Sequence, residues 1–76
     1  MKVLIVESSK ELSALWRRHL ERLGAVVAIA HDQDSATTLL QRRDFSIMVL
    51  DLVLDHGSAL AVADFASYRR PDCRVI

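Results

Sequence analysis

Short apolar runs alternate along the chain with longer segments whose apolar residues recur at helical spacing. Three of these runs cover residues 3–6, 25–30 and 47–50. Each run is too short for a typical helix and carries no polar side chain, which is typical of strands covered on both faces. A fourth strand is expected at residues 73–76, directly after the break at Pro71 and Asp72.

The first segment between these runs has the signals of a helix. Ser8 and Glu11 have the spacing of a capping box, and Gly24 is placed to end the helix. The apolar residues of this segment fall on one helical face: Leu12, Leu15, Trp16, Leu20 and Leu23. We therefore interpret Trp16 as a core residue, with a place in a dimer contact as the alternative. Three arginines are read as a solvated face and as favourable charges near the end of the helix: Arg17, Arg18 and Arg22.

Two further helices are predicted. Asp32 is a plausible N-cap of the first, which carries an apolar stripe of Ala36, Leu39 and Leu40. The second spans about Ala59 to Arg69. The resulting order, β-α-β-α-β-α-β, predicts an α/β fold with a parallel sheet and right-handed crossovers. No linker or repeat divides the chain, so we interpret residues 1–76 as one domain.

Composition narrows the possible classes of protein. The 76 residues are 51% hydrophobic, and ten basic residues balance ten acidic ones, so a globular chain without a strong overall charge is expected. Direct binding of nucleic acid is therefore not expected. No segment approaches the roughly 20 apolar residues that span a bilayer, so no membrane association is expected either. The apolar run after Met1 and Lys2 is too short for a signal peptide, and the single Cys73 cannot form an internal disulfide, so we expect a cytoplasmic protein.

Two carboxylates follow the first and third strands. Glu7 comes directly after the run at residues 3–6, and Asp51 directly after the run at residues 47–50. If the two strands are parallel neighbours, both acids lie at the same edge of the sheet. In open α/β sheets, ligands bind at this carboxyl edge. An acid in this position can also simply cap the following loop, but its coincidence with Glu7 favours a functional site.

The sequence as a whole resembles the receiver domain of bacterial two-component response regulators. The resemblance rests on "KVLIVE", "LERLG", "LLQRRDF", "SIMVLDLVLDHGSAL" and "RRPDCRVI" in this order and spacing. It implies a flavodoxin-like, doubly wound parallel sheet of order 2-1-3-4-5. It also covers the family's domain only in part, because the chain ends after the fourth strand and lacks the fifth strand and the last two helices.

The resemblance implies roles for particular residues. Asp51 matches the phosphoacceptor, which receives a phosphoryl group from a sensor histidine kinase or a phosphotransfer protein. Glu7, Asp51 and the backbone carbonyl of Val53 match positions that bind Mg²⁺, a cation that prefers hard oxygen ligands. Response-regulator receiver function in two-component phosphorelay signalling is therefore the first hypothesis.

The chain departs from the family's pattern at several positions. Ser8 stands where the family has a second acid, so Mg²⁺ is expected to bind more weakly. Asp55 replaces a common proline and Ala59 a common glycine; Asp55 could serve as a metal ligand, although loop aspartates are usually solvated. The family's switch Ser/Thr and its phosphate-binding Lys would both lie beyond Ile76.

Two alternatives follow from these departures. The first is a degenerate receiver-like module that acts without phosphorylation, by dimerising or by binding a partner. A sheet without its remaining elements would expose apolar surface and an open edge, which favours a homodimer. The second is a phosphatase with an aspartate nucleophile, which needs a second acid at the position of Val53. This acid is missing, so we do not expect an enzyme.

The remaining candidates favour structural interpretations. The spacings of His19, His31 and His56 match no metal motif, so each is expected to be solvated. Cys73 is expected to be a small buried residue in the fourth strand.

Overall fold

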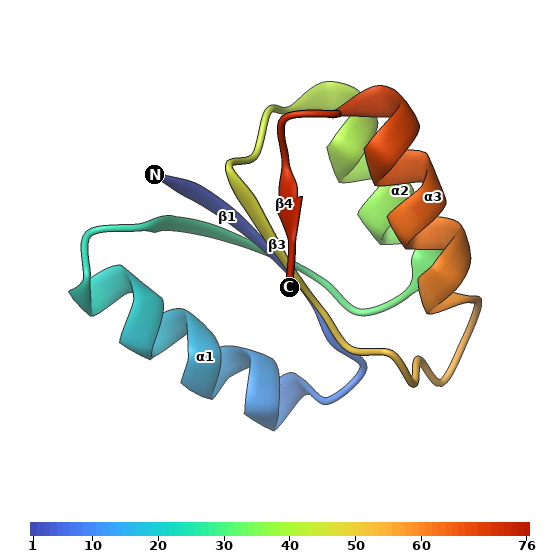
Figure 1. The fold of residues 1–76 in the computed structure, drawn as a ribbon. Helices are drawn as coiled ribbons and strands as arrows, with labels where there is room; N and C mark the ends of the chain where they lie inside the picture. Colours follow the sequence, from blue (N-terminus) through green and yellow to red (C-terminus); the bar gives the residue numbers. More distant parts are fainter.

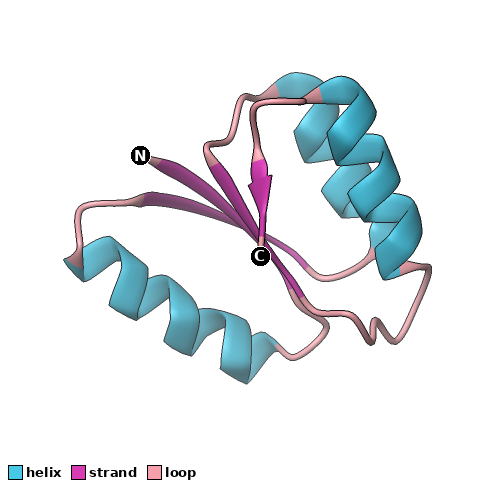
Figure 2. Ribbon diagram, in the orientation of Figure 1, coloured by secondary structure: helices cyan, strands magenta, loops and turns pink.

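One parallel sheet separates helices on its two faces (Figures 1 and 2). A computed structural model describes residues 1–76. Its elements are β1 (Lys2–Val6), α1 (Lys10–Arg22), β2 (Val26–Ala30), α2 (Gln33–Arg42), β3 (Ile47–Leu50), α3 (Ala59–Arg69) and β4 (Arg74–Val75). The strands lie in the order β2-β1-β3-β4, and all neighbouring pairs are parallel. The predicted α/β class, element order and flavodoxin-like strand order are therefore confirmed.

The larger part of the core lies between the sheet and the two helices α2 and α3. Alternate residues of a strand point to opposite faces, so Leu4 and Val6 of β1 and Met48 and Leu50 of β3 face this side. They form one cluster with seven other buried residues: Ala30, Ala36, Leu40, Phe45, Ala59, Val62 and Ala66. The stripe predicted on α2 is confirmed, since Ala36 and Leu40 are buried and Leu39 packs against the cluster.

The opposite face of the sheet is covered only by α1 (Figure 1). Its buried cluster has four members, Val3, Ile5, Ala25 and Val27, with Leu20 packed against them. The predicted packing of the whole α1 stripe is wrong: Leu12, Leu15 and Trp16 are 41%, 47% and 46% exposed, and Leu23 is 82% exposed. A single helix beside β1 and β2 buries only part of its apolar face, so Trp16 is not a core residue.

The start of α1 also differs from the prediction. Ser9, not Ser8, is the N-cap, and its hydroxyl accepts a hydrogen bond from the amide of Leu12 at 3.1 Å. The predicted capping box of Ser8 and Glu11 is therefore wrong, by one residue in the position of the cap. The predicted role of Gly24 is confirmed, because it follows the helix with φ +91°, a conformation that glycine adopts without a steric penalty.

The other helix starts agree with their sequence signals. Asp32 caps α2 and forms a reciprocal capping box with Ser35, as expected of an acidic N-cap. Ser58 caps α3 by accepting a hydrogen bond from the amide of Ala61 at 3.2 Å. The predicted range of α3 is confirmed at both ends.

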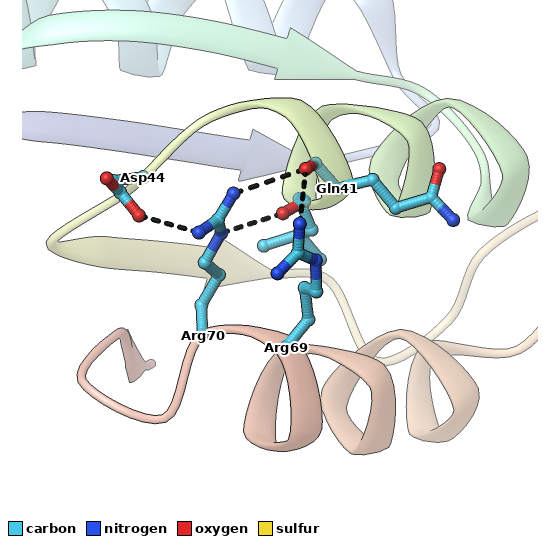
Figure 3. A network of polar contacts seen from close by, with 5 residues as sticks. Gln41, Asp44, Arg69 and Arg70 are labelled. Carbon is cyan, nitrogen blue, oxygen red and sulfur yellow. Dashed lines mark hydrogen bonds and ion pairs between the residues drawn. The ribbon is translucent and has the colours of Figure 1, made fainter.

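Two arginines at the end of α3 bind the end of α2 (Figure 3). Arg70 donates to the carbonyl oxygens of Leu40 at 2.8 Å and Gln41 at 3.2 Å, and it pairs with Asp44 at 2.8 Å. Arg69 donates to the same Gln41 carbonyl at 3.1 Å. Carbonyl groups at the end of a helix lack intrahelical partners and carry partial negative charge, so these cations satisfy and stabilise them.

The last strand is shorter than predicted. β4 contains only Arg74 and Val75, so Cys73 precedes the strand instead of lying in it. Cys73 is half-buried, not fully buried, and this partial desolvation raises the pKa of its thiol. None of the three helices is long and apolar enough to cross a membrane.

Candidate functional site

The structure brings Glu7 and Asp51 to the same edge of the sheet. They directly follow Val6 and Leu50, which are paired in the adjacent parallel strands β1 and β3. The amide of Asp51 donates to the carbonyl oxygen of Val6 at 2.9 Å, which fixes the backbones of the two strand ends side by side. The predicted meeting of the two acids at the carboxyl edge is therefore confirmed; their roles stay predictions.

Asp51 is half-buried and already makes one local contact. Its Oδ1 accepts a hydrogen bond from the amide of Val53 at 3.0 Å. The carboxylate thus caps the loop that follows β3, the structural role foreseen for an acid at a strand end. This bond occupies one of the two carboxylate oxygens, and an ionised carboxylate has further acceptor capacity on the other.

Glu7 is held from two sides. Its Oε2 accepts a hydrogen bond from the amide of Ser9 at 3.0 Å. Its backbone carbonyl lies 2.9 Å from Nδ1 of His31; because a carbonyl oxygen only accepts, the ring nitrogen is the donor. His31 is therefore bonded to the loop after β1, and the prediction that it is merely solvated is wrong.

Ser8 contacts the loop after β3. Its Oγ accepts a hydrogen bond from the amide of Asp55 at 2.9 Å, across 47 residues of sequence. The side chain of Asp55 is exposed, as expected of a loop aspartate, and Ala59 is buried at the start of α3. Ser8, at the position where the resemblance leads one to expect a second acid, thus joins the loop after β1 to the loop after β3.

A third acid, Asp32, lies beside this edge as the N-cap of α2. Asp32 accepts hydrogen bonds from the amide of Ser35 at 2.8 Å and from its hydroxyl at 2.7 Å, and these bonds lower the pKa of Asp32. A polar cavity of about 160 Å³ is lined by Asp32, Gln33, Asp34, His56 and Gly57. A cavity of about 390 Å³ lies elsewhere, beside Asp44, Arg70 and Cys73, and no residue of the candidate site lines it. Neither cavity is lined by Glu7 or Asp51, so the candidate site is identified by its two carboxylates and not by the size of a cavity.

The available ligands fit a hard divalent cation only sparsely. Glu7 and Asp51 supply two carboxylates, and the chain holds no group of three or more His, Cys, Asp or Glu side chains that could bind a metal ion. Mg²⁺ commonly uses one or two carboxylates and retains several waters, so this donor set is compatible with it. His19 and His56 are exposed, and none of the histidines forms part of a metal cluster.

Three residues beside the site were assigned no role from the sequence. Gln33 Oε1 accepts a hydrogen bond from the amide of Ser58 at 2.9 Å. Between them lies Gly57, with φ +89°, and a Cβ at this position would lie only 2.4 Å from Cβ of Gln33. The only sequence signals were a glycine followed by serine before an apolar segment, and they indicate a turn but not its partner.

Comparisons with known proteins agree with this geometry. No family model matches the chain. The photosynthetic apparatus regulatory protein RegA of Cereibacter sphaeroides is 28% identical over 74 residues, which cover 97% of this chain and 40% of RegA. A response regulator from Burkholderia pseudomallei, solved with a phosphorylated aspartic acid, a calcium ion and citrate, is 28% identical with a TM-score of 0.94. The chain has the fold of a response-regulator receiver domain.

A second receiver domain supports the same conclusion. The non-phosphorylated receiver domain of HemR from Leptospira biflexa is 27% identical and superimposes with a TM-score of 0.85 over 93% of this chain. The chain spans only 44% of the Burkholderia protein and 57% of the HemR chain. The comparisons thus support a receiver role for this fold. They do not extend to the parts of the longer relatives that this chain does not span.

Proposed function

We propose that this receiver domain accepts a phosphoryl group on Asp51 in two-component signalling. The observation that carries the proposal is the placement of Glu7 and Asp51 at the carboxyl ends of adjacent parallel strands. The donor is a sensor histidine kinase or a phosphotransfer protein. The similar Burkholderia protein, which carries a phosphorylated aspartic acid and a calcium ion, supports both the acceptor chemistry and a divalent cation.

In the proposed transfer, a carboxylate oxygen of Asp51 attacks phosphorus. A new bond forms between this oxygen and phosphorus, while the bond from phosphorus to the donor nitrogen breaks and its electron pair stays on the donor imidazole. The hydrogen bond from the amide of Val53 orients the carboxylate before the attack. Glu7, Asp51 and the carbonyl of Val53 would hold Mg²⁺, which when bound neutralises charge on the phosphoryl oxygens.

The test is the mass of the intact protein after incubation with acetyl phosphate and Mg²⁺. We expect an adduct of one phosphoryl group that disappears with a chelator and in Asp51→Asn, a variant of nearly equal size. Asp55→Asn is the matched control, because the Asp55 side chain is an exposed carboxylate in the same loop. An adduct that persists in Asp51→Asn would contradict the assignment of the acceptor.

A receiver-like interaction module is the second candidate. Two observations favour it: the hydroxyl of Ser8 already bonds the amide of Asp55, and only two acidic side chains meet at the site. Folded protein that never forms the adduct would support this module. The homodimer and the cytoplasmic location stay predictions, and light scattering on dilute protein tests the dimer, since a folded monomer would contradict it.

A further inference from the structure

The loop between β3 and α3 has little apolar packing of its own. Leu52 and Val53 are 75% and 78% exposed, and only Leu54 packs against the larger core cluster. An exposed loop loses few stabilising contacts when it moves, unless specific hydrogen bonds hold it in place. The conformation beside Asp51 therefore depends on polar contacts.

Ser8 supplies one of these contacts from the loop after β1. Its hydroxyl bonds the amide of Asp55, which lies two residues beyond Val53. Val53 is itself bonded through its amide to Asp51. The two bonds hold the segment between Asp51 and Asp55 at both ends, one end to the acceptor carboxylate and the other to the neighbouring loop. A neutral hydroxyl accepts the second bond without adding a third carboxylate beside Glu7 and Asp51.

Gln33 supplies a contact from the first turn of α2. Its side-chain oxygen accepts a hydrogen bond from the amide of Ser58, the N-cap of α3. The absence of a side chain at Gly57 permits this approach, because a Cβ there would clash with Gln33. The end of the loop next to α3 is thus tied to α2, while Asp55 is tied to the loop after β1 through Ser8.

We propose that Ser8 and Gln33 are positioning residues that hold this loop so that the backbone of Val53 faces Asp51. The proposal rests on the proposed function, because positioning matters only if Asp51 reacts or binds a cation. It assigns Ser8 a specific task in place of the metal ligand that the resemblance leads one to expect. Each residue acts through the loop backbone, by accepting a hydrogen bond from an amide of the loop.

The first test compares Ser8→Ala with Ser8→Thr, which keeps a hydroxyl, and with Ser67→Ala, which removes an exposed hydroxyl from α3. Exchange of the Asp55 and Val53 amides, followed by NMR, reports the order of the loop. We expect Ser8→Ala to speed both by about two- to tenfold, the range that one net hydrogen bond gives. In Ser8→Thr and Ser67→Ala, both amides should exchange at rates close to those of the original protein. Gln33→Ala should speed exchange of the Ser58 amide in the same way.

Mg²⁺ titration of the same variants shows whether the loop matters to the site. We expect Ser8→Ala to weaken Mg²⁺ binding by a similar two- to tenfold and Ser8→Thr to restore it. Unchanged exchange of the Val53 amide in Ser8→Ala, or unchanged Mg²⁺ affinity despite faster exchange, would overturn the proposal. If the original protein neither binds Mg²⁺ nor forms the adduct on Asp51, the proposed function fails. The exchange of the Val53 amide then still decides whether Ser8 orders the loop.

Discussion

At the scale of single residues, Asp32 links the charge of one carboxylate to the stability of α2. Its hydrogen bonds from Ser35 lower its pKa below the usual 3.8, so the folded state favours the ionised form. A depressed pKa contributes stability that is present above the unfolded value and is lost as pH falls through the folded value. The contribution of Asp32 is therefore fully present at neutral pH and is lost as the pH falls through the acidic range.

Asp32→Asn tests this linkage, because asparagine still caps a helix but cannot ionise. We expect the variant to melt at a lower temperature than the original protein at about pH 7, and the difference to vanish at about pH 2. Thermal melts followed by circular dichroism at several pH values measure it. Asp34→Asn, an exposed acid in the same turn, is the control. A difference that stays constant across this range would show that shape, not charge, gives Asp32 its effect.

Which residues could be predicted depended on how local their contacts are. Glu7 and Asp51 were found because two strand ends and one pairing rule place them together. The bond of Ser8 to Asp55 spans 47 residues and that of Gln33 to Ser58 spans 25, so each depends on the conformation of two loops at once. Apolar periodicity carries no information about such pairs, which is why Ser8 was interpreted only as a helix cap and as a missing acid.

At the scale of elements, Arg70 joins the ends of α2 and α3. Its side chain is only 19% exposed and caps two carbonyls of α2, whereas its ionic partner Asp44 is 84% exposed (Figure 3). Hydrogen bonds from a charged donor contribute about 1.5–3 kcal/mol, and exposed ion pairs about 0.2–1 kcal/mol. The hydrogen bonds of Arg70 to the end of α2 should therefore contribute more to the free energy of unfolding than its ion pair with Asp44.

Urea denaturation of Arg70→Ala and Asp44→Asn separates the two contributions. We expect Arg70→Ala to lower the free energy of unfolding by about 1.5–3 kcal/mol and Asp44→Asn by less than about 1 kcal/mol. Arg69→Ala, which removes a single exposed bond to Gln41, should lie closer to Asp44→Asn. Equal losses in Arg70→Ala and Asp44→Asn would mean that the ion pair holds the two helices together.

The helices also show where sequence patterns predict packing and where they do not. The apolar stripe of α2 was predicted correctly, because α2 and α3 cover the same side of the sheet and bury it together. For α3 only the residue range was predicted. The apolar stripe of α1 is as clear in the sequence, yet Leu12, Leu15 and Trp16 are about half exposed. A periodic pattern identifies the helix, but how much of its apolar face is buried depends on the neighbours that share that face of the sheet.

At the scale of the whole molecule, the two faces of the sheet should contribute unequally to stability. Leu40 is fully buried in the larger cluster, while Leu15 on α1 is 47% exposed. Truncating a buried leucine costs about 2–5 kcal/mol, a large part of the roughly 5–15 kcal/mol that stabilises a typical domain. A half-exposed leucine removes less area from water, so its truncation should cost about 1 kcal/mol.

Leu40→Ala and Leu15→Ala are therefore a matched pair for urea denaturation at several protein concentrations. We expect a large loss for Leu40→Ala, a small one for Leu15→Ala, and midpoints independent of concentration if the protein is a monomer. A large loss for Leu15→Ala that grows with concentration would instead mean that the α1 side is covered by a second copy of the chain. The same pair thus measures the imbalance between the two faces and tests for a homodimer formed through the α1 side, because only association there makes an exposed leucine behave as a buried one.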